Sequence, residues 1–84
     1  MNQKDVETLV RSEVLRILPN VEINWESLGY QMDSLDRLEF VEHLGGIISV
    51  NLDILLMNPS VWSSFESLSG LISKLVAQKI NDKE

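Results

Sequence analysis

Apolar residues recur at helical spacing in three stretches of the chain, and the segments between them lack a clear period. In the first stretch, residues 3–18, apolar positions three or four apart alternate with charged ones and predict an amphipathic helix. Pro19 would end this helix, because proline disfavours helical backbone in the preceding residue and has no N–H to donate. The apolar positions are Val6, Leu9, Val10, Val14, Ile17 and Leu18.

Residues 19–33 show neither helical nor strand periodicity and contain Gly29, which predicts a long loop with a short turn at residues 25–28. A loop of this length is unusual in a small domain and is often functional. Its apolar side chains are expected to hold it against the core; they are Val21, Ile23, Trp25 and Leu28.

The second helix is predicted over residues 34–48. Asp33 stands before it as a candidate N-cap, and Asp36 follows three residues later, near the positive end of the helix dipole. Gly45 and Gly46 are expected to weaken its last turn by about 1 kcal/mol each relative to alanine.

On a helical wheel, at about 100° per residue, this second helix has an apolar and a polar side. Leu35 falls on the polar side, between Glu39 and Glu42. A single exposed leucine usually has no special meaning, but one beside a helix-start serine and several acids suggests a contact point for a partner. The expected core side holds Leu38, Val41, Leu44 and Ile48, widened by Phe40 and Ile47; the polar side holds Asp36, Glu39, Glu42 and His43.

Helix-start signals predict two further helices in the C-terminal part. Asn58 as N-cap and Pro59 at the first helical position predict a short helix over residues 59–62. A capping box over residues 63–66, with Ser63 as cap and Glu66 reaching back to it, predicts a last helix over residues 64–80. Its apolar stripe is Leu68, Leu71, Ile72, Leu75 and Val76.

The 84 residues are enough for one domain, placed over residues 1–84, and the predicted elements give an all-α fold: a small four-helix bundle with three main helices and one short helix. Thirteen acidic and seven basic residues give a net charge of −6, which disfavours nucleic acid as a partner. The acids either attract basic partner surfaces or only keep the protein soluble. The longest apolar runs are far shorter than the ~20 residues that a membrane span needs, so no membrane contact is expected.

The chemistry available to the side chains is narrow. The chain has no cysteine, which excludes disulfides and thiolate metal sites and suits a reducing cytoplasm. Its one histidine, His43, lies more than two helical turns after Ser34, too far to activate that hydroxyl. One histidine among scattered carboxylates also lacks the ligand cluster of a metal centre. We therefore expect that the protein is not an enzyme by itself.

The stretch DSLDRLEFVEHL, residues 33–44, resembles the attachment motif of the acyl carrier protein family and of the related peptidyl carrier domains. The resemblance covers most of the chain, from the long first helix and the loop with the pair Leu28-Gly29 to the short third helix and the last amphipathic helix. It implies that Ser34 carries a 4′-phosphopantetheine arm, attached by a separate phosphopantetheinyl transferase. The thiol of the arm would hold acyl or aminoacyl cargo as a thioester.

The same resemblance implies that the second helix docks basic surfaces on the loading enzymes, synthases or transferases that act on the cargo. Leu35 would be an apolar anchor among acids. The implied docking residues are Asp33, Leu35, Asp36, Glu39 and Glu42. We expect a cytoplasmic monomer.

Three features depart from the family pattern. Two extra residues lengthen the loop between Gly29 and Asp33, Gly45 and Gly46 stand where fatty-acid carriers often have acids, and residues 54–57 are unusually apolar. We expect this last segment to add to the core, with a cargo or partner surface as the alternative. These departures favour a specialised pathway, such as polyketide, nonribosomal peptide or modified fatty acid synthesis.

A different class of function remains as the alternative. The protein would then be a small acidic helical interaction module, an adaptor or inhibitor, in which Ser34 is only a helix cap, a common role for serine at a helix start.

Overall fold

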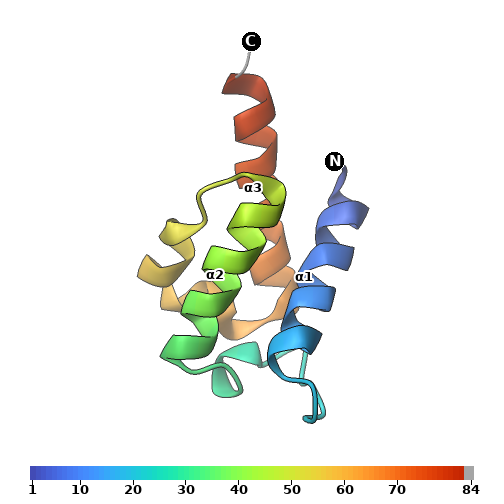
Figure 1. The fold of residues 1–84 in the computed structure, drawn as a ribbon, viewed down its shortest axis with the longest axis vertical. Coiled ribbons are helices and arrows are strands. Elements are labelled where there is room, and N and C mark those ends of the chain that lie inside the picture. Colours follow the sequence, from blue (N-terminus) through green and yellow to red (C-terminus); the bar gives the residue numbers. More distant parts are fainter. Residues whose placement is uncertain (83–84) are drawn as a thin grey trace.

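The computed structural model describes residues 1–82, with side chains described up to residue 79; residues 83 and 84 of the expected domain lie outside the described part. Within residues 1–82 the chain forms three α-helices, three 3-10 helices and no strand (Figure 1). The expected all-helical fold is confirmed, and the segment expected as a short helix at residues 59–62 is a 3-10 helix. The elements are α1 (Gln3–Ile17), η1 (Leu28–Tyr30), α2 (Ser34–Ile48), η2 (Asp53–Met57), η3 (Pro59–Ser63) and α3 (Phe65–Asp82).

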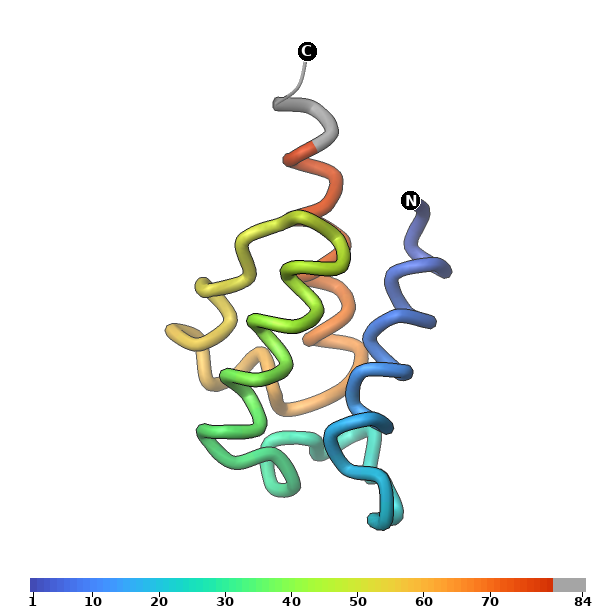
Figure 2. The backbone as a smooth tube through the Cα atoms, viewed as in Figure 1, coloured from blue at the N-terminus to red at the C-terminus, as the bar shows by residue number. Residues whose placement is uncertain are grey.

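The helices form a small elongated body that measures 41 × 24 × 19 Å along its principal axes. Helix α1 packs against both α2 and α3, while η2 packs on α2 and η3 packs on α3 and η1. The tube in Figure 2 shows that α2 begins at the end of the molecule where the long loop lies, and that α1 begins and α3 ends toward the opposite end. The start of α2 is therefore well separated from the start of α1 and from the end of α3.

The predicted stripes of α1 and α3 supply much of the core. An Asn2–Asp5 capping box starts α1, with each side chain accepting from the other residue's backbone N–H. The fully buried positions of the two helices are Val6, Val10 and Val14 on α1 and Leu68, Ile72 and Val76 on α3, while Leu9, Ile17, Leu18, Leu71 and Leu75 pack at the margin.

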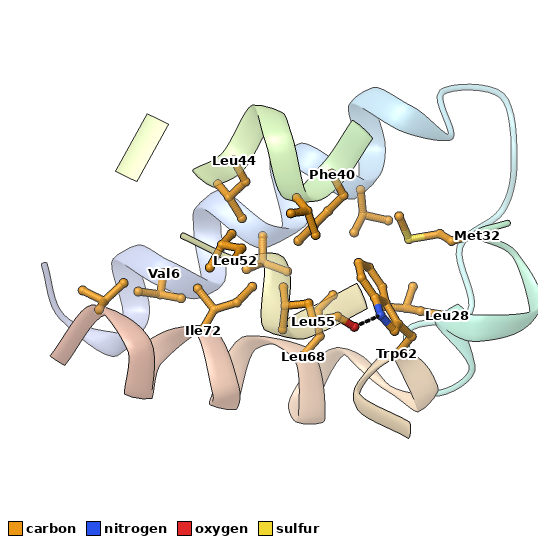
Figure 3. Packing of buried hydrophobic residues seen from close by; sticks show 14 residues of the cluster. Val6, Leu28, Met32, Phe40, Leu44, Leu52, Leu55, Trp62, Leu68 and Ile72 are labelled. Carbon is orange, nitrogen blue, oxygen red and sulfur yellow. Dashed lines mark hydrogen bonds between the residues drawn. The ribbon is translucent and has the colours of Figure 1, made fainter. Parts of the chain in front are cut away.

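Helix α2 buries most of the side that the wheel predicted, including Phe40, Val41 and Leu44, with Ile48 at the margin, but it does not bury Leu38 or Ile47. Phe40 packs edge-to-face on Trp62 of η3, with ring centroids 5.3 Å apart, and Val41 and Leu44 are buried beside it (Figure 3). Leu38, expected in the core, is 42% exposed, and Ile47 is also exposed. The expectation failed because η2 and η3 pack on the side of α2 that includes Phe40, which rotates the buried face away from Leu38.

Trp62 anchors the irregular segment between α2 and α3. Its ring is fully buried, and its indole N–H donates to the carbonyl of Leu55 at 2.9 Å (Figure 3). Leu55 is the one buried residue of the apolar segment 54–57. The expectation that this segment adds to the core therefore holds for Leu55, whereas its neighbours Ile54, Leu56 and Met57 are exposed.

The starts of η3 and α3 differ in detail from the predicted caps. Asn58 occupies the N-cap position of η3, but its amide donates to the carbonyl of Ile54 at 2.8 Å instead of capping. Ser64, not Ser63, caps α3, because Ser63 belongs to η3; the Ser64 hydroxyl accepts from the N–H of Ser67 at 3.1 Å.

The loop before α2 is held partly by its own polar groups. The Gln31 amide oxygen accepts from the N–H of Asn24 at 2.7 Å, and its NH₂ donates to the carbonyl of Glu22 at 2.7 Å. The predicted turn at residues 25–28 is present, since the N–H of Ser27 donates to the carbonyl of Asn24 at 3.0 Å, and η1 follows it. Leu28 and Met32 are buried, but Val21, expected to reach the core, is exposed.

Candidate functional site

Ser34 is the first residue of α2, and the two acids around it form the helix cap. Asp33 is the N-cap: its carboxylate accepts from the N–H of Asp36 at 2.9 Å. The carboxylate of Asp36 in turn accepts from the N–H of Asp33 at 3.2 Å. This reciprocal pair is a capping box, with aspartate in both places. The predicted cap at Asp33 is confirmed, and the side chain of Ser34 does not cap the helix.

The hydroxyl of Ser34 is exposed and makes no hydrogen bond to any residue that the structure describes. The backbone N–H groups of Ser34 and Leu35 likewise have no hydrogen-bond partner within that part of the chain. Free N–H groups at the positive end of a helix dipole favour an anion. The start of α2 thus combines an accessible hydroxyl with two unused donors.

The predicted docking residues divide into three groups. Leu35 is 75% exposed, and Leu38, which sequence reasoning placed in the core, lies beside it in one shallow groove with Glu39 and Glu42. The rest of this groove is lined by Arg16 from α1 and by His43. Asp33 is exposed outside the groove, and Asp36 is half-buried and engaged in the cap.

Glu39 was expected to be a free acid, but it is paired. Its carboxylate lies 2.8 Å from Arg16 Nη2, and the same nitrogen lies 2.5 Å from the carboxylate of Glu13. The hydrogen bond to Glu13 is the largest cause that raises the pKa of Arg16; burial opposes it, and the charge of Glu13 and the contact with Glu39 add to the increase. Glu42, which has no ion pair within the described residues, is therefore the freer acid of the groove.

His43 is engaged at the α1–α2 interface. Its Nδ1 lies 2.7 Å from the second carboxylate oxygen of Glu13, a side chain that is only 3% exposed. The histidine is thus a structural contact of α1. Among the described residues, no group of three or more histidine, cysteine, aspartate or glutamate side chains is placed to hold a metal ion.

Sequence reasoning missed two cations that shape this region, Arg16 and Arg37. Arg16 reaches from α1 to Glu39, and Arg37 reaches back from α2 to the loop, where it donates to the carbonyls of Met32 and Gly29. For Arg16, the acid three residues earlier, Glu13, was a weak signal of a local pair. The contact of Arg37 with the loop depends on tertiary packing, and the helical pattern contains no sign of it.

No helix within residues 1–82 combines the length and apolar character that a membrane crossing requires. No protein-family model matches the chain, and comparisons with curated proteins and with solved structures give no significant match.

Proposed function

We propose that the protein is a carrier of the acyl carrier type, with Ser34 as the attachment point of a 4′-phosphopantetheine arm that holds acyl or aminoacyl intermediates as thioesters. The observation that carries the proposal is that the cap of α2 is formed by the residues around Ser34 and not by Ser34 itself. Asp33 and Asp36 cap the helix, so the Ser34 hydroxyl is exposed, free of hydrogen bonds to described residues and available for modification.

The residues around Ser34 fit a phosphodiester on this hydroxyl. The unused N–H groups of Ser34 and Leu35 are suited to bind its anionic oxygens, and the dipole of α2 favours negative charge at the same place. When bound, the arm would supply a terminal thiol, which the chain itself lacks because it has no cysteine. The protein would present this group, while partner enzymes perform the chemistry.

The order of elements supports the same proposal at the level of fold. In chain order, α1 and α3 flank the capped helix α2, and η3 lies between α2 and α3, an order compatible with the short third helix expected for an acyl-carrier-like fold. The groove on α2, with exposed Leu35 and Leu38 beside Glu42, offers an apolar contact and a free acid to a basic partner surface. We place this carrier in a specialised biosynthetic pathway, as a cytoplasmic monomer.

The proposal is tested by incubating the protein with coenzyme A and a broad-specificity phosphopantetheinyl transferase, followed by intact mass spectrometry. The Ser34 oxygen should displace adenosine 3′,5′-bisphosphate and gain one phosphopantetheine group, and Ser34→Ala should gain none. Ser12→Ala, which changes an exposed serine of α1, is the matched control and should load like the wild type. Loading of Ser34→Ala, or no loading of the wild type, would contradict the proposal.

A further inference from the structure

Arg37 joins three segments at the attachment site with a single side chain. From the first turn of α2, its Nε donates to the carbonyl of Met32 and its Nη2 to the carbonyl of Gly29, each at 3.0 Å. Its guanidinium carbon also lies 5.4 Å from the ring centroid of the buried Trp62, within range of a cation–π contact. One residue of α2 therefore holds both η1 and η3.

The guanidinium of Arg37 lies in space that a side chain at position 29 would crowd. A Cβ atom at Gly29 would lie 3.3 Å from the carbonyl oxygen of Trp62 and 3.4 Å from Arg37 Nη2. Both contacts are tighter than or at the edge of ordinary packing, so the absence of a side chain at position 29 lets η1 approach η3 and the guanidinium together. The planar fork of arginine donors suits two carbonyls at once, which a lysine ammonium cannot reproduce in the same geometry.

The segment that Arg37 holds leads directly into the modified position. Met32 is two residues before Ser34, and Tyr30, Ser34 and Arg37 line one shallow surface hollow. The connection between α1 and α2 runs over residues 18–33 with only η1 inside it, and a long connection costs conformational entropy to order. The carbonyls of Gly29 and Met32 are the points at which α2 fixes it.

We infer that Arg37 is a positioning residue, whose guanidinium fixes the loop of residues 29–32 against α2 and so sets how Ser34 is presented to a modifying enzyme. The inference rests on the proposed function of Ser34. Without the two hydrogen bonds, the loop would sample several conformations, and only a fraction would present Ser34 for docking. The apparent affinity for the transferase is then the intrinsic affinity multiplied by the fraction of molecules that present Ser34 correctly. The rate of transfer within the bound complex does not change.

The test measures KM and kcat for phosphopantetheine transfer to the wild type, Arg37→Met, Arg37→Lys and Gly29→Ala. We expect Arg37→Met to raise KM by about tenfold with kcat within about twofold. Arg37→Lys keeps the positive charge but not the two hydrogen bonds, so its KM should lie between those of the wild type and Arg37→Met. A KM equal to that of the wild type would mean that charge alone accounts for the effect. Gly29→Ala keeps Arg37 but crowds it, and should raise KM in the same direction.

Two controls separate positioning from general loss of stability. Val76→Ala removes buried volume from α3, away from the loop, and should leave KM unchanged despite a lower melting temperature. Amide hydrogen exchange should become faster in Arg37→Met at residues 31 and 32, whose N–H groups donate to the carbonyl of Leu28, and remain unchanged in α3. If the wild type is loaded but Arg37→Met shows an unchanged KM or unchanged hydrogen exchange in the loop, the inference about Arg37 is wrong and the proposed function of Ser34 stands. A wild type that is not loaded at all would overturn the proposed function as well.

Discussion

The imidazole of His43 on α2 meets the carboxylate of Glu13 on α1, with Nδ1 2.7 Å from Oε1. Glu13 is nearly fully buried, and its other oxygen binds Arg16. A buried carboxylate without partners would be costly, so these two contacts are what allow an acid to lie between the helices. The α1–α2 interface is therefore part apolar and part ionic.

Replacing Glu13 tests how much this arrangement stabilises the fold. Glu13→Ala should lower the free energy of unfolding by about 1–3 kcal/mol, because it empties space between the helices and leaves Arg16 and His43 without their shared acceptor. Glu13→Met fills the same space without charge and should cost less than alanine, as for other buried ionic groups. Urea unfolding followed by circular dichroism measures both; a methionine variant that is less stable than the alanine variant would contradict this ranking.

The exposure of Leu38 gives a second prediction about stability. Leu38→Ala should cost less than about 1 kcal/mol, as is usual for surface positions, whereas Leu44→Ala, at a fully buried position later in the same helix, should cost about 2–5 kcal/mol. The pair is matched in chemistry and in helix, so the difference reports burial alone. Equal losses in chemical denaturation would show that Leu38 is packed in solution.

Glu42 is the sharpest probe of docking, because Asp36 is engaged in the cap and Glu39 is paired with Arg16. Glu42→Lys should slow loading by the transferase about 3- to 10-fold at low salt, with a smaller effect at high salt, because exposed charges are screened. Glu66→Lys, at an exposed acid of α3 outside the groove, makes the same change in net charge. If both variants slow loading equally, net charge rather than this groove governs the encounter.

The two adjacent glycines of α2 should respond in opposite ways to alanine. A Cβ at Gly45 would lie 2.9 Å from the backbone carbonyl of Val50, whereas one at Gly46 would meet nothing within 4 Å. Gly46→Ala should raise the free energy of unfolding by about 0.5–1 kcal/mol through helix propensity. Gly45→Ala should lower it, since the connection to η2 must move. The melting temperatures of the two variants test this prediction. If both variants are more stable than the wild type, the carbonyl of Val50 can move away from the added Cβ at little cost.

Local signals in the sequence predicted the helices well. Proline at position 19 and the cap at Asp33 act over a few residues, so the bounds of α1 and α2 could be inferred from the chain alone. Because Asp33 supplies the cap, Ser34 becomes the first residue of the helix and its hydroxyl is not used for capping.

The errors came from contacts between segments far apart in the sequence. The wheel for α2 assumed one core side, but η3 places Trp62 against Phe40 and turns Leu38 outward. The docking face was drawn as a row of free acids, and only the packing of α1 shows that Arg16 neutralises Glu39. The helical periodicity of the sequence could reveal neither the exposure of Leu38 nor the pairing of Glu39, because it describes a single helix and not the elements that pack against it.

The separation of Ser34 from the start of α1 and the end of α3 has a practical consequence. Helix α1 begins and α3 ends toward the pole of the molecule away from the start of α2 (Figure 1). A resin linkage attached near the start of α1 or near the end of α3 would leave the exposed side chain of Ser34 facing open solution. The immobilised protein could thus be exposed to one modifying enzyme after another, with washing between them, while its serine stays accessible.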